Sequence, residues 1–224
     1  MKIGLITYHY PHLKTEQVIL NFLKRYPPHL FGIYALPWTQ RQNREVIIMH
    51  RPAQHRAVAP EVIAKAYQIE YRPVERDTEI PNGYDLYIIL GAGILSADFV
   101  RGKKIINCHP GILPAVRGLD AFKWTIYEMK PLGVTLHYID EEVDSGEIIS
   151  VIPTPVFITD DLETLARRHY ENEIYVLSNF EEYLNRPVNP FFGIESGEPH
   201  KRMPLSVEKE MVRKFEEWKN KYGL

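Results

Sequence analysis

The stretch YDLYIILGAGILSADFVRGKKIINCHP, residues 84–110, decides the fold that we expect. It holds two short apolar runs, residues 84–91 and 102–110, whose length and composition are typical of buried strands. The residues between them, 92–102, hold a short helical turn. Strands and helices that alternate in this way are typical of the parallel sheets of α/β proteins.

The same alternation continues through the rest of the chain. We expect further strands at residues 2–8, 30–36, 68–74, 133–140 and 146–156. We expect helices at residues 14–26, 59–67, 119–129, 162–185 and 206–223, and a loop at 187–204. The pattern predicts an α/β protein with a mostly parallel twisted sheet, helices on both faces and a short C-terminal helical extension.

Some of these elements carry more detailed expectations. Thr15 is a candidate cap of the first helix, and Pro60 lies in the first turn of the second. Residues 133–140 alternate apolar and polar side chains, as a half-exposed strand does, and 146–156 is its expected antiparallel neighbour. Residues 162–185 have the spacing of one long amphipathic helix.

The 224 residues, 45% of them hydrophobic and 25% charged, are enough for one sizeable domain with its own core. We divide the chain into a main domain, residues 1–185, and a C-terminal loop and helix, residues 186–224. Whether this extension forms a homodimer contact or covers a substrate is left open by the sequence.

The net charge of −2 and the lack of a long basic run exclude the electrostatic pattern of a nucleic-acid-binding protein. No apolar run is long enough to span a membrane, and the N-terminus is too polar for a signal peptide. The single cysteine cannot form an intramolecular disulfide, which suits a reducing compartment. We therefore expect a soluble cytoplasmic protein.

The end of the strand at 102–110 carries three chemically active side chains. Side chains alternate along a strand, so Asn107 and His109 point to one face and Cys108 to the other. The amide can donate to a developing oxyanion, and the imidazole can move a proton near neutral pH. Cys108 is expected to fill space in the core, because no activating base shares its face.

A carboxylate partner is expected for the imidazole. The stretch YIDEEVDSGEI offers Asp140, Glu141, Glu142 and Asp144, and Asp144 precedes a Ser-Gly turn that could direct it into a cleft. Residues of these types at strand ends and turns more often have structural roles only. The nine histidines show no spacing that frames a metal site.

Several ordered motifs in residues 91–149 resemble one family. GILSADFV, INCHPGILPAVRG, Trp124, GVTLHYID and DSGEII together resemble the folate-dependent formyltransferases, and a weaker resemblance extends over residues 1–183. The resemblance implies a Rossmann-like formyltransferase fold and a catalytic triad of Asn107, His109 and Asp144. It implies formyl transfer from 10-formyltetrahydrofolate to an amine.

The resemblance also implies roles for the site residues. Asn107 and His109 would stabilise the oxyanion, His109 would help take the proton of the amine, and Asp144 would orient His109 and raise its pKa. His137 has either a supporting role or a packing role. The pterin would lie in an apolar cleft whose residues are Gly91, Ala92, Gly93, Ile94, Leu95, Ile139, Asp140 and Val143.

Branches of the family differ in the amine that they formylate. The glycinamide ribonucleotide branch has a glycine-rich phosphate loop after its first strand, where this chain reads YHYPHLKTEQV. The methionyl-tRNA branch has a long basic C-terminal domain, whereas residues 186–224 are short. We therefore expect the amine of a dTDP- or UDP-linked amino-dideoxy sugar, used in lipopolysaccharide O-antigen or other surface polysaccharide synthesis.

Other functions stay open. The same residues could formylate glycinamide ribonucleotide or methionyl-tRNA, deliver the formyl group to water, or only bind folate or a nucleotide. For the sugar nucleotide, we expect contacts from residues after the first strand and from loops at the same edge of the sheet. These residues are Tyr8, Tyr10, His12, Lys14, Arg76, Gly111 and Trp124, with His200, Lys201 and Arg202 as weaker candidates. Lys14 is expected at a helix N-terminus that holds phosphates, and Gly111 stands where many family members have serine.

Overall fold

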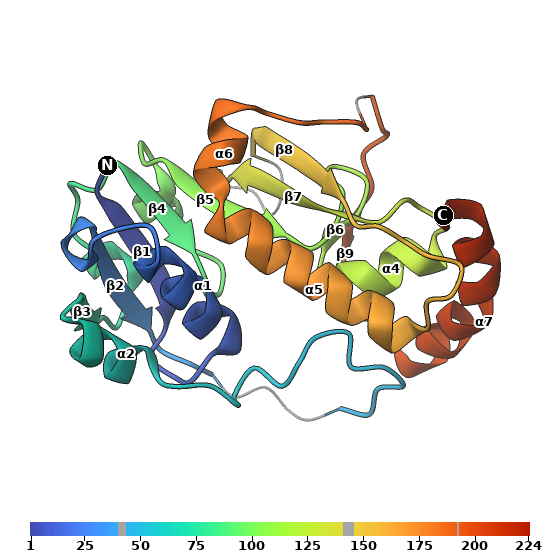
Figure 1. The fold of residues 1–224 in the computed structure, drawn as a ribbon, viewed down its shortest axis with the longest axis horizontal. Coiled ribbons are helices and arrows are strands. Elements are labelled where there is room, and N and C mark those ends of the chain that lie inside the picture. Colours follow the sequence, from blue (N-terminus) through green and yellow to red (C-terminus); the bar gives the residue numbers. More distant parts are fainter. Residues whose placement is uncertain (40–43, 141–145, 192) are drawn as a thin grey trace. The chain divides into compact units, whose positions relative to one another are not determined.

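The structure is a computed structural model that describes residues 1–39, 44–140, 146–191 and 193–224 (Figure 1). The chain folds into two compact units. Unit 1 comprises Met1–Arg41, Ala53–Asn107 and Tyr138–Glu142, and unit 2 comprises Gln42–Pro52, Cys108–His137 and Val143–Leu224. The boundary between Asn107 and Cys108 falls inside one strand, β5 (Ile105–His109).

Unit 1 is built on parallel strands. These are β1 (Ile3–Tyr8), β2 (Phe31–Leu36), β3 (Glu70–Pro73) and β4 (Leu86–Ile89), followed by β5. Strand β1 pairs with both β2 and β4, and β4 pairs with β5. The strand order in the sheet is β3-β2-β1-β4-β5-β7-β8. The expected mostly parallel α/β class is confirmed, since the pairs from β3 to β5 are parallel and helices alternate with strands along the chain.

The helices of unit 1 are α1 (Leu13–Leu23), α2 (Pro60–Tyr67) and α3 (Ala97–Val100), with 3-10 turns η1 (Pro28–Leu30) and η2 (Asp77–Glu79). Pro60 begins α2, as expected. The expectation that Thr15 caps α1 is wrong, because His12 is the N-cap residue. The Thr15 hydroxyl is instead 2.8 Å from His12 Nδ1 and 2.5 Å from the Thr7 hydroxyl, inside the helix.

Unit 2 contains the antiparallel pair β7 (Gly133–Tyr138) and β8 (Ile148–Pro153). Its helices are α4 (Ala121–Tyr127), α5 (Leu162–Ser178), α6 (Phe180–Asn185) and α7 (Leu205–Tyr222). Two short strands, β6 (Arg117–Gly118) and β9 (Pro199–His200), pair in parallel. Part of the expected loop at 187–204 is therefore strand.

Two expectations for unit 2 are wrong. Strand β7 is buried over Gly133–His137 rather than half-exposed, since Thr135 points its hydroxyl at the Gly111 carbonyl oxygen, 2.7 Å away, instead of at solvent. The long helix breaks at Asn179, where the side-chain amide donates to the Tyr175 carbonyl oxygen at 2.6 Å. A side chain that binds the backbone in this way competes with continued helix.

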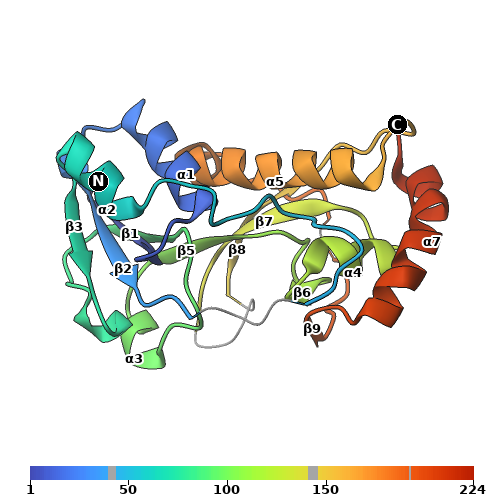
Figure 2. The ribbon, with the colours of Figure 1, turned by 90° about the horizontal axis from the view of Figure 1, so that it is seen from below.

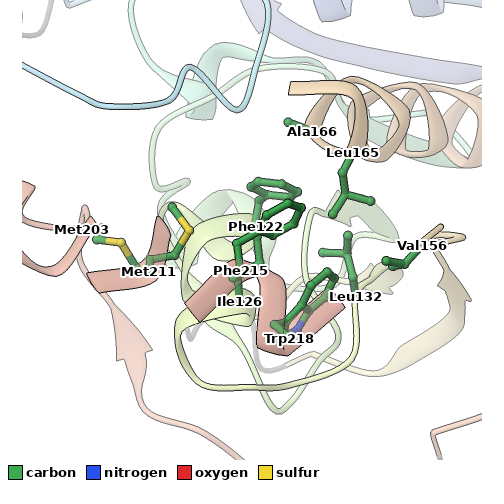
Figure 3. Close-up of a cluster of buried hydrophobic side chains, with 10 residues drawn as sticks. All are labelled: Phe122, Ile126, Leu132, Val156, Leu165, Ala166, Met203, Met211, Phe215 and Trp218. Carbon is green, nitrogen blue, oxygen red and sulfur yellow. The ribbon is translucent and has the colours of Figure 1, made fainter. Parts of the chain in front are cut away.

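The core of unit 2 lies between α4, α5 and α7 (Figure 3). Phe122 and Ile126 of α4 meet Met211, Phe215 and Trp218 of α7. Figure 2 shows α7 lying beside α4. The predicted terminal helix therefore packs as an integral part of unit 2, because its apolar face buries large side chains. The division at residue 185 stays a prediction.

Among the described residues, no helix combines the length and apolar character that crossing a membrane requires. Within the same residues, no cluster of three or more His, Cys, Asp or Glu side chains could hold a metal ion.

Candidate functional site

Asn107 and His109 lie at the end of β5. Ile105 and Ile106 before them are fully buried, which fixes the strand in the sheet. Because side chains alternate along a strand, Asn107 and His109 share a face, and Cys108 on the other face is 1% exposed. A buried thiol on the opposite face is consistent with the expected packing role of Cys108.

The ring of His109 is held by the loop that follows the strand. His109 Nε2 is 2.8 Å from the carbonyl oxygen of Val116. A carbonyl oxygen only accepts, so Nε2 carries a hydrogen and donates it. In the neutral ring, Nδ1 therefore carries the lone pair. The Val116 carbonyl oxygen therefore favours the tautomer that carries its hydrogen on Nε2.

Gly111 permits this arrangement. A Cβ atom at position 111 would lie 2.9 Å from the Val116 oxygen and 3.0 Å from His109 Nε2. These distances leave no room for a methyl group beside the hydrogen bond. Gly111 was expected to contact substrate, and that role stays a prediction. The structure gives it a different role as well, which is to keep space between His109 and its partner.

The backbone of the loop after β5 is fixed by three further side chains. His169 of α5 contacts the Pro110 carbonyl oxygen at 3.1 Å. The Thr135 hydroxyl donates to Gly111 O at 2.7 Å and accepts from Leu113 N at 3.0 Å. Lys130 donates to Ala115 O at 2.8 Å. A loop with so many bonded carbonyl groups holds the His109 ring in one position.

His169 is a site residue that the sequence did not reveal. Burial lowers its pKa to about 4, so the ring is neutral near pH 7. Its Nδ1 accepts from the Thr154 hydroxyl at 2.8 Å, and its Nε2 donates to Pro110. Asn172 donates to the Thr154 oxygen at 3.0 Å. The only hint in the sequence is a histidine on the apolar face of an amphipathic helix, which is more often simple packing.

Four of the predicted residues lie outside the described residues, so their roles stay predictions: Glu141, Glu142, Val143 and Asp144. Asp140 is exposed. His137 is completely buried in β7, which suits either of its two expected roles.

The residues after β4 lie beside those after β1. A Cβ atom at Gly91 would lie 2.9 Å from the Tyr8 ring and 3.0 Å from the His12 ring. A Cβ atom at Gly93 would meet nothing within 4 Å, and Ile94 is 86% exposed. In unit 1 the structure thus brings Gly91, one of the predicted folate residues, next to two of the predicted substrate residues, Tyr8 and His12.

Further partly buried apolar side chains of unit 1 lie on and near the residues that follow β4. Ala92, Leu95 and Ile139 pack against the hydrophobic core that contains Val100 and Ile105. The amide of Ile139 donates to the Ile105 carbonyl oxygen at 2.9 Å. An apolar surface therefore lies behind the exposed backbone of residues 91–94.

The N-terminus of α1, where we expected phosphates, is partly occupied. Leu13 N donates to Gln54 O at 2.8 Å, and Lys14 N donates to Gln54 Oε1 at 3.1 Å. Lys14 is 6% exposed, and Glu16 adds a negative charge to the first turn. A phosphate at this helix end would have to displace Gln54, so the role of Lys14 stays a prediction.

The remaining substrate candidates are spread over the chain. In unit 1 the exposed Arg76 faces Glu79 at 3.9 Å. In unit 2 the Trp124 ring stacks on His200, with centroids 4.2 Å apart, and its Nε1 donates to Lys201 O at 2.9 Å. Trp124, which belongs to α4, therefore attaches the segment that contains β9 to this helix. A ligand contact of Trp124 stays a prediction.

The parallel sheet defines an α/β protein. The amide and the imidazole at the end of β5 are residue types that acyl-transfer sites use. The chain belongs to the formyl transferase family, whose model matches residues 44–180. The resemblance inferred from the motifs is thereby confirmed.

Curated relatives match part of the chain. It is 41% identical over 86 residues to phosphoribosylglycinamide formyltransferase of Bacillus subtilis, which is 38% of this chain and 43% of that protein. It is 42% identical over 83 residues to the trifunctional purine biosynthetic protein adenosine-3 of Gallus gallus, 36% of this chain and 8% of that protein. The chain therefore spans less than half the length of these relatives.

Solved structures match nearly the whole chain. A sugar N-formyltransferase from a Shewanella species has a TM-score of 0.61 at 15% identity, covering 96% of this chain and 87% of that one. An N-formyltransferase from Helicobacter canadensis has a TM-score of 0.60 at 16% identity, covering 96% and 80%. These likenesses show that the fold extends beyond the stretch shared with the curated relatives.

Proposed function

We propose that the protein transfers a formyl group from 10-formyltetrahydrofolate to the amine of a nucleotide-linked amino-dideoxy sugar. The observation that carries the proposal is the pair Asn107 and His109 on one face of β5, in a chain of the formyl transferase family. An oxyanion donor and a proton acceptor two residues apart can act on one reacting group.

The cosubstrate supplies a formyl group carried on nitrogen. As the acceptor amine bonds to the formyl carbon, the Asn107 amide donates a hydrogen bond to the oxygen that gains negative charge. The His109 imidazole takes the proton that the amine loses. The Val116 carbonyl oxygen, bonded to Nε2, stabilises the resulting imidazolium. By resemblance, Asp144 orients this ring, and the proton is returned to the departing nitrogen.

The residues after β4 suit a flat heterocycle. Gly93 leaves its backbone accessible, and Ile94 offers an exposed apolar side chain. Ala92, Leu95 and Ile139 supply apolar surface behind them. Strand β4 pairs with β5, so these residues follow the strand next to Asn107. Backbone groups here would bind the pterin edge.

Two solved relatives support the acceptor class. The Helicobacter canadensis enzyme was crystallised with folinic acid and dTDP-3-aminofucose. A formyltransferase from Anoxybacillus kamchatkensis, with a TM-score of 0.53 at 24% identity, was crystallised with a UDP-linked formamido sugar and tetrahydrofolate. The loop after β1 of our chain has aromatic rings and no glycine, which favours a nucleotide sugar over glycinamide ribonucleotide. A role in surface polysaccharide synthesis, a cytoplasmic location and a homodimer stay predictions.

The curated relatives favour a second candidate, formylation of glycinamide ribonucleotide. A third is hydrolysis to formate, because the chain is 31% identical over 103 residues to formyltetrahydrofolate deformylase 2 of Arabidopsis thaliana.

One assay separates the three. The purified protein is incubated with 10-formyltetrahydrofolate and either dTDP- or UDP-linked amino sugars, glycinamide ribonucleotide, or no amine. We expect formamido product only with amino sugars. Product with glycinamide ribonucleotide alone, or formate released without any amine, would contradict the proposal.

A further inference from the structure

Unit 1 carries an exposed aromatic stack that joins two predicted substrate residues, Tyr8 and Tyr10, to Trp38, which has been given no role so far. The rings of Tyr10 and Trp38 lie nearly parallel, with an interplanar angle of 13° and centroids 5.8 Å apart. The Tyr8 ring meets Trp38 edge-on at 4.7 Å. Tyr10 is 42% exposed and Trp38 is 37% exposed. Large apolar rings are normally buried, so two stacked and accessible rings suggest a surface that another flat ring completes.

The stack lies where ligands bind in such sheets. Strand β1 ends at Tyr8, and strand β2 ends at Leu36, two residues before Trp38. The two strands are parallel, so both ends belong to the carboxyl edge of the sheet. Ligands of open α/β sheets bind outside this edge. Tyr8 also packs against Gly91, at the start of the residues expected to bind folate.

The stack is preorganised by backbone contacts. His9 N donates to the Leu36 carbonyl oxygen at 2.9 Å, and His9 Nδ1 donates to the same oxygen at 3.0 Å. These two bonds tie the residues after β1 to the end of β2. A surface that needs no ordering loses little entropy when a ligand binds.

The chain neighbours of the stacked residues line a cavity of about 530 Å³. These neighbours are His9, which lies between Tyr8 and Tyr10 in the sequence, and Pro37, which precedes Trp38. Glu61 and Glu75 also line this cavity. Carboxylates oppose a phosphate but accept hydrogen bonds from hydroxyl and ring N–H groups. The cavity therefore suits the nucleoside end of a ligand and not its diphosphate.

We propose that Tyr10 and Trp38 bind the base of the nucleotide-linked acceptor by stacking on it. The inference rests on the proposed function and deepens it, because it assigns Trp38 as a specificity residue that favours acceptors with a planar base. An acceptor without a base, such as a ribose phosphate, gains nothing from this surface. Loss of a base–aromatic stack weakens binding by roughly 5- to 100-fold.

Tryptophan fluorescence tests the proposal directly. Wild-type protein is titrated with UDP, dTDP, ribose 5-phosphate and folinic acid, and the dissociation constants are checked by calorimetry. We expect UDP or dTDP to quench the fluorescence and ribose 5-phosphate to have no effect. The variant Trp38→Phe keeps an aromatic ring, so it should bind nucleotide with near wild-type affinity and lose the quenching. Quenching that persists in this variant would overturn the proposal, since Trp124 or Trp218 would then be the reporter.

Two further variants test whether the Trp38 ring contributes to nucleotide affinity. Trp38→Ala should weaken nucleotide binding by roughly 5- to 100-fold and raise KM for the amino sugar without changing kcat. Tyr67→Ala is the matched control, because Tyr67 is a similarly exposed aromatic residue at the end of α2. It should bind like the wild type.

The outcomes separate the two proposals. Amino-sugar formylation with an unchanged KM in Trp38→Ala would overturn the stacking proposal and leave the proposed function standing. A wild-type protein that binds neither UDP nor dTDP would overturn both. An effect of Trp38→Ala on folinic acid binding alone would show that the stack serves the pterin, and would also overturn the proposal.

Discussion

At the residue scale, the candidate site depends on an imidazole whose tautomer is fixed by the backbone. His109 donates from Nε2 to the Val116 carbonyl oxygen, so Nδ1 carries the lone pair in the neutral ring. Asn107 shares its face of β5, and Cys108 occupies the opposite face. Asn107 and His109 are therefore the two catalytic candidates, and a substitution of Cys108 serves as the control for substitutions of either.

We predict that Asn107→Ala and His109→Ala each abolish useful turnover. Loss of an oxyanion donor or a proton-transfer group typically lowers kcat by about 10²- to 10⁴-fold. Steady-state kinetics with formyl donor and amine measure the effect, and circular dichroism checks the fold. Cys108→Ala, which trims a buried side chain on the other face, should keep kcat. Full activity in His109→Ala would rule out the mechanism.

We predict that Gly111→Ala lowers kcat by roughly 10- to 100-fold, because small displacements of a catalytic group cost about that much. The new methyl group would sit 3.0 Å from His109 Nε2 and 2.9 Å from Val116 O, so the hydrogen bond must lengthen. Kinetics and the NMR shift of the His109 ring protons measure the change. An unchanged kcat would show that the Val116 contact is dispensable.

At the element scale, helix α5 supports the loop after β5. His169 uses its one donor on Pro110 and its one acceptor position on Thr154, both of which fit a neutral ring. Helix α7 is anchored to α4 by a buried ion pair, Lys123 Nζ to Glu208 Oε1 at 2.5 Å. Each helix is thus tied to the rest of unit 2 by polar groups inside an apolar core.

We predict that His169→Phe keeps the fold but lowers kcat, because the Pro110 carbonyl loses its donor and the loop holding His109 loosens. His169→Gln can donate from its amide to Pro110 and should recover most of the activity. The pH profile of kcat separates positioning from simple packing. If His169 positions the loop, the profile is shifted in His169→Phe and returns to the wild-type profile in His169→Gln. Equal losses in both variants would contradict this role.

We predict that Lys123→Met and Glu208→Leu each lower the free energy of unfolding by about 3–5 kcal/mol, since each leaves a buried charge without its partner. The two side chains are 1% and 0% exposed. The double variant should lose less than the sum, as in a double-mutant cycle. Urea unfolding measures all three. Additive losses would show that the pair does not interact.

At the scale of the whole molecule, unit 2 keeps two histidines neutral, the buried His169 and the half-buried His50. Burial lowers the pKa of His169 to about 4. Burial, followed by the charge of Arg51, holds the pKa of His50 well below its ordinary value. His50 stacks on Phe122, which in turn contacts His169. Protonation of either ring therefore opposes the folded state.

We predict that stability falls as pH drops from about 6.5 to about 4. In this window the unfolded chain binds a proton at His169 that the folded chain does not, so the free energy of unfolding rises with pH. The contribution of His169 is at most roughly 3 kcal/mol. Thermal unfolding of the wild type and His169→Gln at several pH values measures it. The variant should show the shallower slope, and equal slopes would contradict the assignment.

The sequence by itself determined the strands of the parallel sheet, the antiparallel pair β7 and β8, and the strand end that carries Asn107 and His109. These features follow from local apolar runs and from the two-residue period of a strand. The motifs also identified the family correctly. Local patterns did not show where α5 ends, because the Asn179 side chain competes with the helix backbone.

Only the tertiary structure decided what surrounds these residues. The contact between His169 and Pro110 joins positions 59 residues apart, and Gln54 reaches the start of α1 from 40 residues away. The stack of Tyr10 and Trp38 likewise forms because β1 and β2 are parallel neighbours. Such contacts depend on how strands and helices pack, which hydrophobic spacing along the chain does not encode.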